Sequence, residues 1–141
     1  MKSRVLFLCT GNSARSQMAE GWLRSLAGDR YDVFSAGTLP VGLNPGSVEA
    51  MAEVGIDISR HRSKSATEFI SMPIDYVVTV CYRAKETCPC WPGSTRLIQW
   101  SFDDPAAIAD ADARRLVFRR ISDEIAAAIR QFLADREKQP S

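Results

Sequence analysis

Near its N-terminus the chain reads Arg4-Val5-Leu6-Phe7-Leu8-Cys9-Thr10-Gly11-Asn12-Ser13-Ala14-Arg15-Ser16. The run that ends at Leu8 is short and apolar, with β-branched and aromatic residues, and it predicts a buried strand. An amphipathic helical pattern follows from Ala14 onward. Backbone N–H groups in a small-residue loop at a helix N-terminus converge on one point and can bind an anion. The stretch therefore predicts a site for an oxyanion, formed by Thr10, Gly11, Asn12, Ser13, Ala14, Arg15 and Ser16.

Cys9 stands at the end of the predicted strand, where these donors favour its thiolate form. Arg15 adds a planar fork of N–H donors that suits a tetrahedral oxyanion, and Ser16 can donate its hydroxyl proton to the thiolate. Cysteine is also among the most often buried residue types, so Cys9 by itself is equally consistent with core packing. The combination favours a nucleophilic thiolate. The lysine of the nucleotide-binding GxxxxGK[ST] loop is missing, which argues against that class of site.

The composition is that of one ordinary globular domain, which we expect to span residues 1–141 with a frayed polar tail at 136–141. The chain has 141 residues, 45% of them hydrophobic and 25% charged, and a formal net charge of +1. This charge gives no indication of a nucleic-acid or membrane surface. The first apolar run is too short for a signal peptide or membrane span, so we expect a cytoplasmic protein. A single histidine disfavours a Cys-His or Ser-His-Asp arrangement.

Apolar runs and helical patterns alternate along the chain. Strands are predicted at 4–8, 31–36, 75–80 and 95–100, and helices at 14–27, 45–54 and 107–135, with a short helix opened by the capping box of residues 65–68. This alternation predicts an α/β fold with a parallel sheet and helices on both faces.

Residues with reactive side chains follow the ends of these predicted strands. They are Cys9, the segment Ser35–Thr38, Cys81, and Asp103 with Asp104. The carboxyl ends of parallel strands meet at one edge, where ligands bind, so we expect these residues to gather there. Asp104 is the first candidate for a general acid that protonates a leaving oxygen, and Asp103 the second. The alternative is that one of them only caps the last helix before Pro105.

Three further cysteines lie close together in the sequence, at positions 81, 88 and 90. Their spacing is unlike the paired ligands of zinc sites, and only Cys9 or His61 remains to complete a set of four, so a redox relay is favoured. Cys81 can attack a sulfur-bound intermediate on Cys9. A bond from Cys81 to Cys88 needs Cα atoms within about 7 Å. An intact helix would hold them ~10 Å apart, so the bond requires a loop or unwinding. Cys90 is interpreted as a bystander.

The basic stretch Arg60-His61-Arg62-Ser63-Lys64 contains the only histidine. We interpret this stretch as a solvated, charged turn, although Lys64 can approach the anion loop from outside and add positive charge.

The motif Val5–Ser16 resembles the phosphate-binding loop of the low-molecular-weight tyrosine phosphatase superfamily. Three further motifs fall in that family's order: Ser35-Ala36-Gly37-Thr38, Gly55-Ile56-Asp57-Ile58-Ser59 and Asp104-Pro105. Within the superfamily the chain is most similar to the thioredoxin-coupled arsenate reductases, through Thr79-Val80-Cys81, Cys88-Pro89 and Phe102-Asp103-Asp104-Pro105-Ala106. Phosphatases of the family usually carry aromatic residues after the Asp-Pro pair, where this chain has Ala106-Ala107-Ile108, and often a second loop cysteine, where it has Ala14.

The resemblance implies a doubly wound fold with a four-stranded parallel sheet, and a relay of three cysteines. In that relay Cys9 attacks arsenate held by the loop and Arg15, while Asp104 protonates the departing oxygen. Cys81 then attacks Cys9 and releases arsenite, and Cys88 resolves the Cys9–Cys81 disulfide. A thioredoxin-like partner, or another thiol reductant, reduces the resulting Cys81–Cys88 bond. The expected protein is a monomer without a cofactor. Phosphate or sulfate would compete with arsenate for its anion site.

Some relatives bind potassium beside the loop through residues equivalent to Asn12, Glu20, Ser35 and an acidic residue at position 64. Lys64 in this chain argues against a metal and can supply the positive charge itself. Two other readings stay open at this point. The same Cys9, Arg15 and Asp104 would serve a phosphatase acting on phosphotyrosine or small phosphate esters, and an anion-binding or redox-sensing module would bind without turnover.

Overall fold

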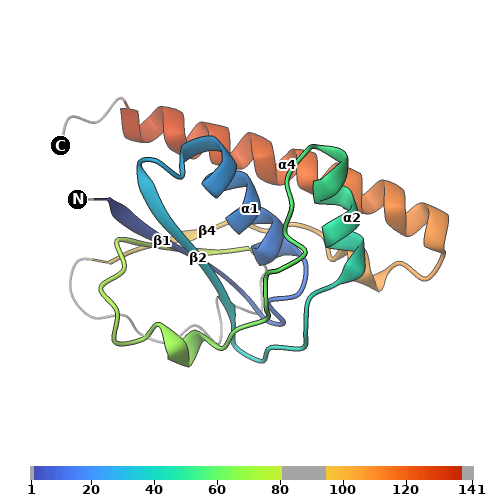
Figure 1. Ribbon diagram of the computed structural model, residues 1–141, viewed down its shortest axis with the longest axis horizontal. Coiled ribbons are helices and arrows are strands. Elements are labelled where there is room, and N and C mark those ends of the chain that lie inside the picture. The colour runs from blue at the N-terminus through green and yellow to red at the C-terminus, as the bar shows by residue number, and fades with distance from the viewer. Residues whose placement is uncertain (1, 81–94, 138–141) are drawn as a thin grey trace.

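The computed structural model describes residues 2–80 and 95–137 (Figure 1). Its elements, in chain order, are β1 (Ser3–Cys9), α1 (Arg15–Ala27), β2 (Tyr31–Gly37), α2 (Pro45–Glu53), the 3₁₀ helix η1 (Ala66–Glu68), β3 (Tyr76–Thr79), β4 (Arg96–Gln99), the 3₁₀ helix η2 (Pro105–Ala107) and α4 (Ala111–Glu137). Cys81, Cys88 and Cys90 lie outside the described residues. Within the described ranges, no helix combines the length and apolar character needed to cross a bilayer.

The four strands form one parallel sheet in the order β2-β1-β3-β4. Cys9 pairs with Gly37 across β1 and β2, and Leu8 pairs with Thr79 across β1 and β3. The carboxyl ends of these strands therefore lie at one edge of the sheet, as the sequence predicts. Cys9 and the Ser35–Thr38 segment are neighbours there, although more than twenty residues separate them in the chain.

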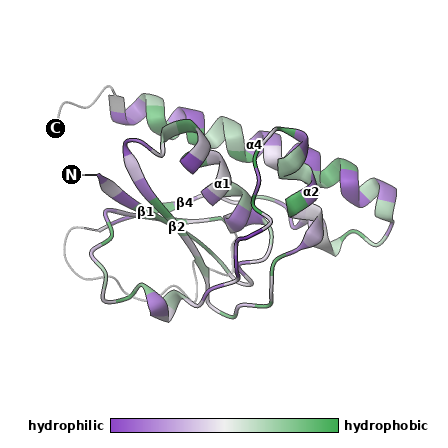
Figure 2. Cartoon of the chain, viewed as in Figure 1, coloured by the Kyte–Doolittle hydropathy of each residue, from purple (hydrophilic) through white to green (hydrophobic). Residues whose placement is uncertain are grey.

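The two faces of the sheet are covered by different parts of the chain, as the hydropathy of each element requires. The rings of Tyr31 and Tyr76 pack on Phe132 of α4, with centroids 5.9 and 5.3 Å apart. On the opposite face, Phe34 packs on Phe69 just after η1, at 5.5 Å. Helix α4 also packs against α1 and α2, and Figure 2 shows hydrophobic and hydrophilic residues alternating along it, so one stripe faces the interior.

Two helix starts follow from residues close in the sequence. The Asn44 side chain accepts a hydrogen bond from the Gly46 N–H at 2.8 Å and caps α2, with Pro45 in its first turn. The predicted capping box is present at η1, where Ser65 and Glu68 satisfy each other's backbone donors. The predicted strands and the first two helices agree with the structure to within one or two residues at each end.

The last helix differs from its predicted bounds at both ends. It begins at Ala111 instead of Ala107, because residues 105–107 form η2 and the Asp110 carboxylate caps α4 by accepting the Ala113 N–H at 2.8 Å. It ends at Glu137, so the prediction of a frayed tail from Arg136 was wrong for its first two residues. The Arg136 guanidinium lies over the rings of Tyr76 and Phe132, 5.3 Å from each centroid, a contact that stabilises this end of the helix against the core.

The burial of α4 predicts how two of its aliphatic side chains contribute to stability. Ile129 is 0% exposed and Leu116 is 62% exposed. We expect Ile129→Ala to lower the free energy of unfolding by about 2–5 kcal/mol, because it leaves a cavity in the core. Leu116→Ala on the outer side of the same helix is the matched control and should change it by less than about 0.5 kcal/mol. Urea unfolding measures both, and equal effects would contradict this assignment of the buried stripe.

Candidate active site

The Cys9 thiol lies inside the loop that links β1 to α1. Its Sγ is 3.1 Å from the backbone N–H of Asn12, which donates to it, and 2.8 Å from the Ser16 hydroxyl. Cys9 is 3% exposed, and Ser16 is fully buried in the first turn of α1. A thiolate at this position would accept both hydrogen bonds. The structure thus places the two donors that the sequence suggested, a loop amide and the Ser16 hydroxyl, around one sulfur atom.

The loop turns its carbonyl groups away from Cys9, and other parts of the chain hold them there. Each carbonyl from Cys9 to Ser13 accepts a hydrogen bond of 2.8 to 3.1 Å from outside the loop. The donors are the backbone N–H groups of Thr38, Leu39, Val41 and Asn44, the Ser63 hydroxyl and the Gln17 amide. The C=O and N–H of a trans peptide point in opposite directions, so outward carbonyls leave inward N–H groups. No cis peptide interrupts this pattern in the described residues.

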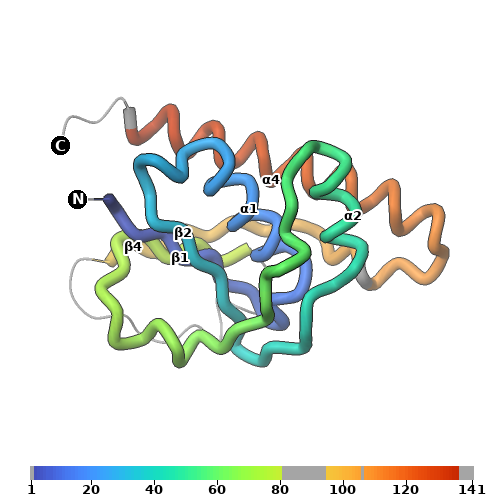
Figure 3. The backbone as a smooth tube through the Cα atoms, in the orientation of Figure 1, coloured from blue at the N-terminus to red at the C-terminus, as the bar shows by residue number. Residues whose placement is uncertain are grey.

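The segment after β2 supplies most of these donors and approaches the loop closely (Figure 3). Gly37 ends β2 at the nearest point. A Cβ atom there would lie 2.5 Å from the Thr10 carbonyl oxygen and 2.8 Å from the Asn12 nitrogen. Both neighbours are backbone atoms that cannot rotate away, so only glycine allows this approach.

The loop changes direction at Asn12. Its φ is +48°, a left-handed conformation uncommon outside glycine, and its side chain is completely buried. The side-chain amide donates to the hydroxyls of Ser16 and Ser35 at 2.8 and 3.0 Å, and its oxygen accepts from the Lys64 N–H at 2.8 Å. These contacts offset the cost of the backbone conformation.

Arg15 and Asp104 meet over the loop, from opposite ends of the chain. One Arg15 guanidinium nitrogen donates to the Phe102 carbonyl at 3.1 Å, and the other lies 3.8 Å from an Asp104 carboxylate oxygen. Asp103 instead accepts a hydrogen bond from Arg120 of α4 at 3.0 Å. Neither aspartate caps α4, since Asp110 does so. The geometry therefore favours Asp104 over Asp103 as the acid beside the anion loop.

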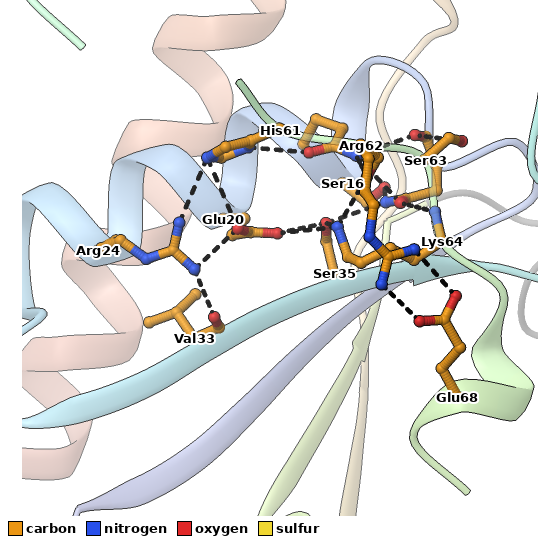
Figure 4. Close-up of polar contacts among 12 residues, drawn as sticks. Ser16, Glu20, Arg24, Val33, Ser35, His61, Arg62, Ser63, Lys64 and Glu68 are labelled. Atoms are coloured by element: carbon orange, nitrogen blue, oxygen red, sulfur yellow. Dashed lines mark hydrogen bonds and ion pairs between the residues drawn. The ribbon is translucent and has the colours of Figure 1, made fainter. Parts of the chain in front are cut away.

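Beside the loop, a buried network of charged and polar groups centres on Glu20 (Figure 4). The Glu20 carboxylate is 2.8 Å from the Arg24 guanidinium, 3.7 Å from the Lys64 ammonium and 2.5 Å from the Ser35 hydroxyl, which donates to it. Because Ser35 also accepts from Asn12, this network is continuous with the loop. A buried carboxylate is tolerated only when paired in this way.

The prediction that residues 60–64 form a solvated turn was wrong for His61, Ser63 and Lys64. The His61 ring is 15% exposed and lies 2.9 Å from Gln17 and 3.3 Å from Arg24, while Lys64 is 13% exposed. Arg62 does lie at the surface, where it pairs with Glu68. The turn folds against a polar strip of α1, which a linear reading of its charges does not show.

Gln17, at the centre of that polar strip, is the member that the sequence did not indicate, whereas Ser16 and Glu20 were named from the motif and the resemblance. Ser16, Gln17 and Glu20 are all buried on α1 among apolar neighbours. Their spacing places them on one side of the helix. Ser16 and Gln17 contact the preceding loop, and Glu20 contacts Ser35 beside it. Three polar residues on the side of a helix that also contributes Met18 and Leu23 to the core are a signal that could have indicated this role.

Residues 4–141 match the model of the low molecular weight phosphotyrosine protein phosphatase family. The chain belongs to this family. It is 46% identical over 132 residues to the arsenate reductase of Halalkalibacterium halodurans, covering 93% of this chain and 95% of that one.

Solved structures of arsenate reductases share the fold. An arsenate reductase in the oxidized state superposes with a TM-score of 0.81 at 30% identity, over 96% of this chain and 98% of that one. A thioredoxin-dependent arsenate reductase of Corynebacterium glutamicum gives a TM-score of 0.78 at 29% identity, over 98% of this chain and 64% of that one. The predicted fold, a four-stranded parallel sheet of the low-molecular-weight phosphatase type, is confirmed.

The surroundings of His61 predict its titration. Burial lowers the pKa of His61 below the usual 6.5, and the nearby cations Arg24 and Lys64 lower it further, against the opposing effect of Glu20. His61 is the only histidine in the chain, so the ring signal in an NMR titration reports it without assignment. We expect a midpoint below 6.5, and a higher one in Arg24→Met because a neighbouring cation is removed. A native midpoint at or above 6.5 would contradict this environment.

The lowered pKa of His61 also determines how its contribution to the free energy of unfolding depends on pH. The folded chain binds the His61 proton less readily than the unfolded chain, so this contribution to stability is complete above the unfolded pKa of about 6.5 and is lost as the pH falls through the folded value. Thermal unfolding of the native chain and of His61→Asn across this range isolates the contribution.

Proposed function

We propose that this protein reduces arsenate to arsenite, with Cys9 as the nucleophile of a cysteine relay. The single observation that carries the proposal is the Cys9 loop, in which a buried sulfur faces a backbone amide and a hydroxyl while every neighbouring carbonyl is turned outward. Such a cradle suits a tetrahedral oxyanion. The curated relatives named arsenate reductase and the order of cysteines along the chain support arsenate as that anion.

The first step uses residues that the structure describes. The Cys9 thiolate attacks arsenic(V) and forms a sulfur–arsenic bond, and Asp104 gives its proton to the oxygen that departs as water. Arg15 holds the remaining oxygens, and its guanidinium lies 3.8 Å from the Asp104 carboxylate, so both groups act on the same anion. The backbone N–H groups of residues 10–16 stabilise the added negative charge in the transition state.

The later steps fall to cysteines that lie outside the described residues. The Cys81 thiolate attacks the Cys9 sulfur, a disulfide forms, and the electron pair of the sulfur–arsenic bond stays on arsenic, which leaves as arsenite. Cys88 then attacks the Cys81 sulfur and releases the Cys9 thiolate. A thioredoxin-like protein reduces the Cys81–Cys88 disulfide, and the likeness to the thioredoxin-dependent arsenate reductase of Corynebacterium glutamicum supports this class of reductant.

Steady-state turnover with a defined reductant tests this relay. Arsenite formation with thioredoxin, thioredoxin reductase and NADPH should fall to background in Cys81→Ser and in Cys88→Ser, because each removes an attacking sulfur. Cys90→Ser is the matched control and should turn over like the native chain. Hydrolysis of a small phosphate ester needs only Cys9, Arg15 and Asp104, so all three variants should keep whatever phosphatase activity the native chain has.

The outcomes separate the candidate functions. Native-like arsenite formation in Cys81→Ser and Cys88→Ser would refute the relay. Efficient ester hydrolysis without any arsenite formation would favour the phosphatase alternative. Anion binding without turnover of either kind would indicate a sensing module.

We also propose that Lys64 replaces a metal ion beside the loop. Its ammonium group is 3.7 Å from the Glu20 carboxylate, 3.5 Å from the Ser35 hydroxyl and 2.8 Å from the Arg62 carbonyl. A potassium ion in contact with the same Glu20 and Ser35 oxygens would lie against this ammonium, so these residues do not fit a metal. Burial lowers the pKa of Lys64, while the Glu20 carboxylate opposes this shift and favours the charged form.

Potassium dependence therefore provides a further test. We expect arsenite formation by the native chain to be the same in potassium and sodium salts at equal ionic strength. Lys64→Met removes the ammonium and leaves Glu20 without one of its cations, so its turnover should fall. A clear rise in native activity with potassium, absent with sodium, would refute the proposal.

A further inference from the structure

Gln17 supports the anion loop through two hydrogen bonds to Asn12. Its side chain is completely buried in the first turns of α1. The two N–H groups of the amide serve three acceptors, so one N–H is shared: the Asn12 carbonyl at 3.1 Å, the Asn12 side-chain oxygen at 3.0 Å and the Arg62 carbonyl at 2.8 Å. The amide oxygen lies 2.9 Å from Nδ1 of His61.

These partners allow only one orientation of the Gln17 amide. Turned by half a rotation, its oxygen would face three oxygen acceptors, and none of these could supply a proton. The oxygen therefore faces His61, whose Nδ1 must carry a proton to donate to it. Nε2 of a neutral His61 is then an acceptor, and the Arg24 guanidinium lies 3.3 Å away as its donor. Burial, Arg24 and Lys64 all favour this neutral ring.

The Asn12 carbonyl belongs to the peptide that carries the Ser13 N–H. Two groups hold this carbonyl outward, the Gln17 amide at 3.1 Å and the Ser63 hydroxyl at 2.9 Å. Because carbonyl and N–H oppose each other across the peptide plane, fixing one fixes the direction of the other. Asn12 is also the loop residue with φ of +48°, so its peptides lack the support of regular secondary structure.

We propose that Gln17 is a positioning residue that aims the Ser13 N–H into the anion site, and that His61 holds Gln17 in the required orientation. Hydrogen bonds run from Arg24 through His61 and Gln17 to Asn12, and so join the surface of α1 to the loop. The proposal rests on the proposed function only in taking this loop as an oxyanion site. It does not depend on arsenic chemistry or on the other cysteines.

Binding of inorganic phosphate to the full chain tests the proposal without turnover. Phosphate in the loop should protect Cys9 from alkylation by iodoacetamide, followed by mass spectrometry of the Cys9 peptide so that the other cysteines do not interfere. Gln17→Met keeps the length of the side chain and removes the donor. In Gln17→Met we expect phosphate to protect Cys9 about tenfold more weakly, equivalent to ~1.4 kcal/mol. Without phosphate, we expect Cys9 of this variant to be alkylated more slowly than Cys9 of the native chain.

Variants at position 61 separate positioning from packing. His61→Leu leaves Gln17 in place but removes the proton that orients it, so protection should weaken by about threefold, a part of the loss in Gln17→Met. His61→Asn places an amide donor at nearly the position of Nδ1 and should restore native protection. Arg62→Ala is the matched control, because it removes an exposed side chain and keeps the carbonyl that Gln17 contacts.

Three results would contradict the proposal. The first is native phosphate protection in a folded Gln17→Met, and the second is native protection in His61→Leu, which decides the matter even where Gln17→Met cannot be purified. Equal weakening in His61→Leu and His61→Asn would also refute the orienting role of the ring. Native phosphate binding with no arsenite formation would instead refute the proposed function and leave this inference standing.

Discussion

The outward anchoring of the loop carbonyls is the constraint on which the site depends. Residues 9–13 cannot form helix or strand hydrogen bonds among themselves, yet each of their carbonyls has a partner within 3.1 Å. The partners come from the segment after β2, from the turn around Ser63 and from α1. Since peptide planes are rigid, this shell of external donors directs the N–H groups inward before any anion arrives. Preorganised donors of this kind stabilise developing negative charge without rearranging during the reaction.

Charge pairing explains how the buried Glu20 carboxylate can lie so near an anion site. Glu20 would repel an oxyanion if it stood alone, but Arg24 and Lys64 lie within 2.8 and 3.7 Å of it and balance its charge. Its oxygens then act as acceptors that order the Ser35 hydroxyl, which in turn accepts from Asn12. The charged network thus supports the geometry of the loop, while Arg15 provides the positive charge that faces the ligand. Removing one member of such a network costs more than the pair contributes, because it leaves the other charge buried and unpaired.

Much of the fold and the centre of the site could be predicted from local sequence. Residues close in the chain determine three local structures: the strand before Cys9, the Asn44 cap with Pro45, and the capping box at Ser65. Predictions failed where a residue's partner is distant. The basic character of residues 60–64 suggested solvent, but His61 and Lys64 meet Gln17 and Glu20 more than forty residues away. Arg136 looked like part of a polar tail, but its guanidinium lies on the rings of Tyr76 and Phe132.

The sequence by itself determined the order of strands and helices, the position of Cys9 at a strand end, and the family to which the chain belongs. The periodicity of hydrophobic residues, the helix caps and the contiguous loop motif each depend on residues close in the chain, so they can be predicted from the sequence. Only the tertiary structure decided which aspartate stands beside Arg15, and which groups hold the loop carbonyls outward so that the N–H groups face the anion site. The sequence ranked Asp104 before Asp103 but left both as candidates, and it is Arg120 of α4 that holds Asp103 away. The orientation of a peptide plane depends on donors brought from other parts of the chain, so no local pattern could have specified it.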